Sequence, residues 1–233
     1  MEKIEIGTEG KSYNLVARTF EEIHGITGVM ITFNEEKYIV KALEELKPLV
    51  KRIVLIDGGS NDRTVELATP LVDFLEVIPF DCHFGKQKNN ALRHCYTDWV
   101  LFMDPDEILS DKLKKKIPSL IEQDEIDCYA FPRREYIDGK EDEEIYPDYQ
   151  DRLFRAYCRF VRPIHEEVVG YKNKKELELG IGIDILHKKE AKRHAGRNRA
   201  YPFYEMHYAN ETGGPGEQTK KTFKDKYKDI TSE

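Results

Sequence analysis

Four short, mainly apolar runs are spaced along the first half of the chain, and three of them end in a polar stretch. The runs cover residues 26–33, 52–56, 74–78 and 99–103. Runs of this length and composition are typical of strands buried on both faces of a sheet. The segment after the first run carries Ile39, Leu43 and Leu46 at helical spacing and ends at Pro48, which indicates a helix between two strands.

The same alternation continues along the first half and predicts an α/β fold. We expect further helices before Pro70 and over residues 86–96. Strands alternating with helices favour a mostly parallel sheet with helices on both faces. In such sheets, ligands bind outside the carboxyl ends of the strands. The polar stretches expected there are Asn34-Glu35-Glu36, residues 57–62, and Asp104-Pro105-Asp106-Glu107.

The two ends of the chain and its second half are less regular. Glycines interrupt residues 1–24, which we interpret as an arm or short hairpin. Past residue 110 the pattern predicts a helix over 110–123, a strand over 126–136 turning at Asp138-Gly139, and strands over 152–161 and 176–186. The predicted domains are therefore an arm (1–24), one α/β domain (25–187), and a basic, aromatic and irregular C-terminal extension (188–233).

Composition narrows the class of protein. The 233 residues fit one large α/β domain or two small ones. The longest apolar run, residues 99–103, is far shorter than the ~20 residues of a membrane span. The N-terminus lacks the apolar segment of a signal peptide, and the four cysteines form no Cys-x-x-Cys pair. We therefore expect a cytoplasmic protein with reduced thiols.

Charge is distributed unevenly. Residues 1–187 carry 26 Lys and Arg against 37 Asp and Glu, whereas residues 188–233 carry 11 against 7. An acidic body argues against general nucleic-acid binding, which needs a basic face. It is compatible with carboxylates that gather a cation, with the basic extension near an anionic ligand. The extension suits a lid over a diphosphate, a peripheral membrane contact, or a solvated helix packed on the core.

Two acidic sites stand out at the predicted strand ends. Asp104 and Asp106 directly follow a buried run, and carboxylate oxygens suit Mg²⁺ or Mn²⁺. An Asp-x-Asp pair is also common in ordinary loops, so the residues alone leave both interpretations open. Asp57 is likewise suited to binding a ligand or to capping its own turn, and Gly58 and Gly59 allow close backbone approach.

Several segments together resemble the family 2 glycosyltransferases of GT-A fold, in the branch that includes lipopolysaccharide-core glucosyltransferases. The matching segments are residues 32–36, 56–64, 84–91, 99–107, 146–150, 152–155 and His165-Glu166. The resemblance spans roughly residues 26–187 and implies a Rossmann-like GT-A sheet. Gly58 departs from the pattern, because many relatives have Asp or Ser there.

The resemblance implies a nucleotide-sugar donor, a UDP-sugar in preference to a GDP-sugar, with Mn²⁺ or Mg²⁺ on its diphosphate. Asp57 would read the base and Asp106 would hold the metal, with His187 as a further metal ligand, a phosphate contact or an ordinary structural histidine. The other expected donor contacts are Thr32, Asn34, Glu35, Lys88, Asn89 and Asp104.

The family inverts the anomeric centre by direct displacement, so a carboxylate must remove the proton of the acceptor hydroxyl. The resemblance favours Glu166 as this catalytic base, with Glu167 and Asp151 as rivals. Arg152 and Arg155 are candidates for phosphate or acceptor binding, or for surface ion pairs. The acceptor stays open: a saccharide, a lipid-linked glycan, a protein or a modified nucleobase.

Three other functions fit parts of the pattern. A sugar nucleotidyltransferase would need a glycine-rich basic loop, which is missing after Ile31. An Asp-x-Asp phosphatase would carry its nucleophilic Asp where Asn34 stands. A non-catalytic nucleotide-sugar-binding module is compatible with every motif.

Overall fold

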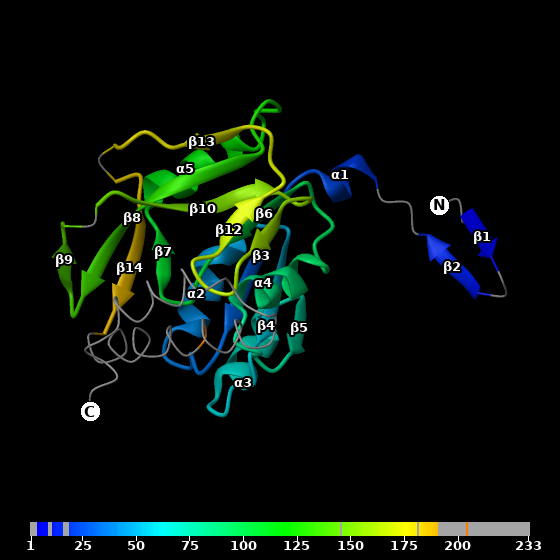
Figure 1. The fold of residues 1–233 in the computed structure, drawn as a ribbon, viewed down its shortest axis with the longest axis horizontal. Coiled ribbons are helices and arrows are strands. Elements are labelled where there is room, and N and C mark those ends of the chain that lie inside the picture. The colour runs from blue at the N-terminus through cyan, green and yellow to red at the C-terminus, as the bar shows by residue number, and fades with distance from the viewer. Residues whose placement is uncertain are drawn as a thin grey trace, which may run out of the picture.

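A ten-stranded sheet forms the centre of the computed structural model (Figure 1). The structure describes residues 4–8, 11–15, 19–144, 146–180, 182–190 and 204. Strands and helices alternate in its first half, while its second half consists mainly of strands. The sheet is the frame on which the polar strand ends are arranged.

The first half of the chain builds the parallel part of the sheet. Its strands lie side by side in the order β5 (Phe74–Val77), β4 (Arg52–Asp57), β3 (Ile26–Thr32) and β6 (Trp99–Phe102), each parallel to the next. The helices between them are α2 (Ile39–Leu46), α3 (Thr64–Ala68) and α4 (Phe84–Leu92), and 3₁₀ turns cover Lys47–Leu49 and Thr69–Leu71. The predicted alternation is confirmed, although α4 begins and ends earlier than the expected 86–96.

Helices cover both faces of this sheet, as the alternation predicted. One apolar layer lies between the sheet and the helices α2 and α5 (Asp111–Leu120), and includes Leu43, Leu55 and Ile117. The other layer lies beneath α4 and includes Val29 and Ala91. Because both faces are covered, the strands can be apolar throughout, which explains the unbroken runs in the sequence.

The second half completes a mixed, mostly parallel sheet. It adds β7 (Glu107–Leu109), β8 (Cys128–Ile137), β9 (Lys140–Asp142), β10 (Asp148–Arg155), β13 (Lys174–Glu176) and β14 (Ile185–Lys189). The order across the sheet is β5-β4-β3-β6-β10-β8-β14-β7, and β9 and β13 also pair with β8. β10 is antiparallel to β6 and β8, whereas β14 is parallel to β8. β8 and its turn at Gly139 confirm the strand predicted over 126–136.

Two predicted strands differ from the structure. The run 152–161 is divided: after β10 the chain turns, with the Cys158 N–H donating to the Arg155 carbonyl, into β11 (Arg159–Val161), which pairs with β12 (Glu167–Val169) in a separate small sheet. The single strand predicted over 176–186 is wrong. β13 ends before Gly180 and Gly182, and the positive φ of Gly182 interrupts the extended chain before β14.

The N-terminal residues form a hairpin, as predicted. β1 (Ile4–Thr8) pairs antiparallel with β2 (Lys11–Leu15), and α1 (Phe20–Ile23) leads into β3. Most of the C-terminal extension lies outside the described residues, including the basic residues Lys192, Arg193, Arg197 and Arg199, whereas Lys188 and Lys189 belong to β14. The described Tyr204 ring lies edge-on to Phe80 and Phe84. Across the described ranges, no helix combines the length and the apolar character needed to cross a membrane. The division into arm, domain and extension stays a prediction.

Candidate functional site

The loops that follow β3 and β4 are joined by side-chain hydrogen bonds. The Asn34 N–H donates to Ser60 Oγ at 2.8 Å, and Asn34 Oδ1 accepts from the Asn61 N–H at 2.9 Å. The Glu35 N–H donates to Thr64 Oγ1 at 2.7 Å. Asn34 has a φ of +56°, a conformation that asparagine tolerates better than most residues. Asn34 and Glu35 are therefore brought to the predicted edge, where these bonds fix the two loops.

Asp57 is fully buried at the end of β4 and caps its own turn. Its Oδ1 accepts from the Gly59 and Ser60 N–H groups at 2.9 and 2.7 Å, and its Oδ2 accepts from Ser60 Oγ at 2.5 Å. Thr32 lies opposite Asp57 in the β3–β4 register. Its buried Oγ1 has no hydrogen-bond partner among the described residues. The capping role is observed, and a role of either residue in reading a base stays a prediction.

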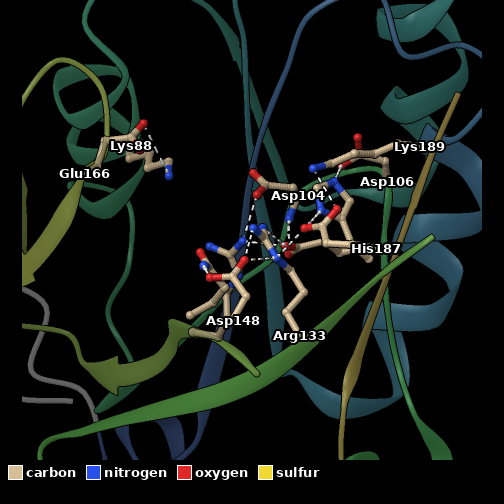
Figure 2. A network of polar contacts seen from close by, with 12 residues as sticks. Lys88, Asp104, Asp106, Arg133, Asp148, Glu166, His187 and Lys189 are labelled. Carbon is tan, nitrogen blue, oxygen red and sulfur yellow. Dashed lines mark hydrogen bonds and ion pairs between the residues drawn. The ribbon is translucent and has the colours of Figure 1, made fainter. Parts of the chain in front are cut away.

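A largely buried group of ionisable side chains occupies the adjoining strand ends (Figure 2). We call it the charged cluster. It consists of Asp104, Asp106, Glu107, Arg133, Glu135, Asp148, Arg152, His187 and Lys189. These residues come from β7 and the loop before it, and from β8, β10 and β14. Segments that are far apart in the sequence therefore meet at one site.

Arg152 and Glu107 form the buried core of the charged cluster. Arg152 Nη2 donates to Asp104 Oδ2 at 2.8 Å and to Glu107 Oε1 at 2.6 Å, and Arg133 Nη1 donates to Glu107 Oε1 at 3.1 Å. Burial alone would raise the pKa of Glu107, but the charges of Arg152 and Arg133 outweigh it and lower the pKa to about 2. Glu107 is thus a fixed negative charge that binds both arginines and holds Arg152 beside Asp104.

His187 lies between two carboxylates. Its Nδ1 is 2.9 Å from Glu135 Oε1, and its Nε2 is 3.3 Å from Asp106 Oδ1. Burial would lower the pKa of His187, but the two neighbouring carboxylates prevail and raise it. The buried Nε2 has no hydrogen-bond partner of good geometry within the described ranges. The structure therefore brings Asp106 and His187 together, with a nitrogen and an oxygen facing each other.

Lys88 and Glu166 form a second, separate pair (Figure 2). Lys88 Nζ lies 3.5 Å from Glu166 Oε1 and over the faces of Phe102 and Phe160, at 4.5 and 4.9 Å from the ring centroids. Asn89 Nδ2 donates to the Phe160 carbonyl at 2.8 Å, and Asn89 Oδ1 accepts from the Phe160 N–H at 2.9 Å. The amide of Asn89 therefore joins α4 to β11.

The loop that carries Glu166 is docked on the start of α4. The Phe84 N–H donates to the Pro163 carbonyl at 2.8 Å, and the Gly85 N–H donates to the Arg162 carbonyl at 3.2 Å. A Cβ atom at Gly85 would lie only 2.5 Å from that Arg162 oxygen, so the close approach requires glycine. The same contacts fix where Glu166 stands.

The rival carboxylates have other partners. Glu167 is exposed and lies 2.9 Å from Arg162 Nη1, and Asp151 Oδ1 lies 2.6 Å from Lys174 Nζ on β13. Arg155 stacks on Trp99, with 4.2 Å between the guanidinium carbon and the ring centroid. These contacts give the positions of the three residues. Their predicted roles in catalysis or in phosphate and acceptor binding stay predictions.

Sequence reasoning did not consider Arg133 or Glu135. It placed Glu107 in a polar stretch at a strand end, Asp148 in a matching segment and Lys189 in the basic extension, but gave none of these three a role. One signal was present: Arg133 and Glu135 are two residues apart in a strand whose first half is apolar, so both point to one face of the sheet. Charges on a strand whose neighbours are buried indicate a paired, internal site.

Comparison with known proteins gives the family. The sequence model "Glycosyl transferase family 2" matches residues 27–176. The SPbeta prophage-derived glycosyltransferase SunS of Bacillus subtilis is 28% identical over 171 residues, covering 70% of this chain and 39% of SunS. The lipopolysaccharide core biosynthesis glycosyltransferase LpsC of Rhizobium meliloti is 33% identical over 119 residues, covering 49% of this chain and 44% of LpsC. This chain spans at most about half the length of these relatives.

Solved structures show the same fold. The S. aureus TarS fragment 1–349 in complex with UDP-GlcNAc superposes with a TM-score of 0.56 at 17% identity, covering 80% of this chain and 67% of the fragment. Glucosyl-3-phosphoglycerate synthase of Mycobacterium tuberculosis, in complex with Mn²⁺, UDP and glucosyl-3-phosphoglycerate, superposes with a TM-score of 0.52 at 14% identity. The match covers 83% of this chain and 82% of the synthase. The predicted GT-A fold is confirmed. Since the family model covers more than half of the sequence, this chain belongs to glycosyltransferase family 2.

Proposed function

We propose that this chain transfers a sugar from a UDP-sugar to an acceptor hydroxyl, with inversion and with the help of Mn²⁺ or Mg²⁺. Membership of glycosyltransferase family 2 supports the reaction class. The observation that carries the proposal is the buried Nε2 of His187 facing Asp106 at the carboxyl ends of the strands. One structural neighbour binds UDP-GlcNAc and another binds UDP with Mn²⁺, which supports the choice of donor and metal.

Asp106 and His187 fit a divalent cation. The described residues hold no ready group of three or more His, Cys, Asp or Glu ligands. Two protein ligands suffice, however, where substrate phosphates and water complete the coordination. The charged cluster has five carboxylates and three permanent cations, so with neutral His187 it carries a formal charge of −2, which a divalent ion would balance. The bound metal would stabilise the negative charge on the leaving diphosphate.

The donor would lie across the ends of β3 and β4. Asp57 uses three of its roughly four acceptor positions on its own turn, which leaves one for a base N–H. Thr32 offers its unpaired hydroxyl on the same face of the sheet. Asp104 lies at the edge of the charged cluster next to Arg152, where the diphosphate would approach.

Glu166 would take the proton of the attacking hydroxyl. As the acceptor oxygen forms its bond to the anomeric carbon, its proton passes to the Glu166 carboxylate and the bond to the diphosphate breaks. Lys88 Nζ contacts the carboxylate at 3.5 Å, and the docking of the loop on α4 holds it in place. The docked loop favours Glu166 over the exposed Glu167, and the match of His165-Glu166 to the family pattern favours it over Asp151.

Replacing the base tests this function without knowledge of the acceptor. UDP release from UDP-glucose and UDP-GlcNAc, with Mn²⁺ present and water as acceptor, measures turnover. Glu166→Gln preserves shape but accepts no proton, so release should slow at least about a hundredfold, since a positioned base contributes ~10²–10⁴. Calorimetry should find UDP affinity in the presence of Mn²⁺ unchanged.

Glu167→Gln and Asp151→Asn are the matched controls, and both should keep most of the activity. An inactive control together with an active Glu166→Gln would move the role to that residue. A wild-type chain that binds UDP but never turns over a donor would instead indicate a non-catalytic nucleotide-sugar-binding module.

A further inference from the structure

Glu135 lies behind His187, on the side away from Asp106, and has no role in the proposed reaction. It is 1% exposed and lies two residues before the end of β8. In the parallel pairing of β8 with β14, Glu135 stands directly opposite His187. Its Oε1 lies 2.9 Å from His187 Nδ1. The contact therefore arises from the register of two strands that are about fifty positions apart in the sequence.

Glu135 is itself fixed by two cations. Arg133 Nε lies 3.0 Å from Oε1, and Lys189 Nζ lies 2.6 Å from Oε2. Arg133 is two residues before Glu135 on β8, and Lys189 is two residues after His187 on β14, so all of them share one face of the sheet. A buried carboxylate held from both sides has one orientation, and it presents that orientation to the imidazole.

The two nitrogens of an imidazole are linked. When Nδ1 carries a hydrogen and donates it to a carboxylate, Nε2 keeps its lone pair and its direction is set. Here that direction is toward Asp106 Oδ1, 3.3 Å away. Without the carboxylate, the ring would lose both its preferred tautomer and its orientation.

We propose that Glu135 is a positioning residue for the metal site: it holds His187 with Nε2 directed at the cation shared with Asp106. This inference rests on the proposed function, because it assumes a divalent cation between these two side chains. Glu135 makes no contact with the cation itself. It sets the affinity for the cation through the ring.

Mn²⁺ binding to the full chain with UDP present tests the role directly. Electron paramagnetic resonance counts free Mn²⁺ in a titration, and pulsed spectra detect ¹⁴N coupling from a ligated imidazole. Glu135→Gln should weaken Mn²⁺ affinity ~10–100-fold, the usual loss for such outer residues, and diminish the ¹⁴N coupling. Glu141→Gln is the matched control. Glu141 lies on β9 and pairs with Arg134, the neighbour of Glu135 on β8, but it does not touch His187.

Glu135→Asp separates position from charge. It keeps a negative charge for Arg133 and Lys189 but shortens the reach to Nδ1, so it should also lose affinity and ¹⁴N coupling. Thermal unfolding without metal checks that each variant is folded. If Glu135→Gln does not fold, Glu135→Asp alone provides the test.

The outcomes distinguish the two proposals. If His187→Ala weakens Mn²⁺ binding while both Glu135 variants bind as the wild type does, the positioning role is wrong and the metal site stands. Wild-type affinity of Glu135→Asp alone would reduce Glu135 to a source of charge and overturn the positioning role. If Asp106→Asn and His187→Ala both leave Mn²⁺ affinity unchanged, the metal site falls and this inference with it.

Discussion

At the scale of single residues, Asp57 has two separable tasks: it caps its turn, and by proposal it accepts a hydrogen bond from the base. Asp57→Asn keeps an oxygen for the Gly59 and Ser60 N–H groups. Its new amide N–H₂ cannot accept from the base, so UDP affinity should fall by ~1–3 kcal/mol, the cost of an unpaired buried group. Titration calorimetry measures this loss.

Ser60→Ala is the control for the turn. It removes the hydroxyl that bonds Asp57 Oδ2 and the Asn34 N–H and leaves the carboxylate intact. UDP affinity should then change much less. Equal losses in the two variants would mean that Asp57 acts through the turn alone. From the sequence alone, Asp57 could cap its turn or bind the base, because both roles need a carboxylate at the end of a strand. Only the hydrogen bonds in the structure show how many of its acceptor positions the turn uses.

At the scale of elements, α4 positions the loop of Glu166 as well as covering the sheet. Gly85→Ala would put a methyl group 2.5 Å from the Arg162 carbonyl and push that loop away. A displacement of about 1 Å can cost ~10² in rate, so UDP release should fall by about that factor while affinity for UDP with Mn²⁺ stays within threefold. Steady-state kinetics and calorimetry on the same protein check both parts.

Gln87→Ala is the control on the same helix. Gln87 Nε2 bonds the Ile78 carbonyl and does not touch the loop, so its loss should leave the rate nearly unchanged. If Gln87→Ala is as slow as Gly85→Ala, general loosening of α4 explains both. The start of α4 was mispredicted for a related reason: His83 Nδ1 accepts from the Lys86 N–H and the first turn bonds a loop near residue 163, contacts that helical periodicity does not reveal.

At the scale of the whole molecule, features that depend on residues close together in the sequence could be predicted, and features that depend on distant strands could not. The parallel half could be predicted, because each of its strands is a local apolar run between breakers. The charged cluster could not, because it needs β8, β10 and β14 in register across the sheet. Asp104 and Asp106 were recognised from a local pattern, whereas Glu107 and Glu135 gain their meaning only from partners on distant strands.

The charged cluster also joins the two halves of the sheet, which makes stability depend on pH. The pKa values of Glu107 and Glu135 are about 2 in the folded chain against an ordinary 4.5. The effect of burial on the pKa is outweighed at Glu107 by the charges of Arg152 and Arg133, and at Glu135 by the hydrogen bonds of His187 and Lys189 and the charge of His187. The unfolded chain therefore binds more protons between these values, and the free energy of unfolding should fall as pH drops from about 5 toward 2. Urea unfolding in EDTA at stepped pH measures the fall.

Glu107→Gln isolates the cluster's share of this dependence. It removes one titrating group and leaves Arg152 and Arg133 without a shared counter-charge, so stability at pH 7 should drop by about 3–5 kcal/mol and the acid slope should flatten. Glu66→Gln, which removes an exposed partner of Arg63, should reproduce the wild-type curve. If the slope of Glu107→Gln equals that of the wild type, acid sensitivity arises elsewhere, and the cluster serves the site without governing the stability of the fold.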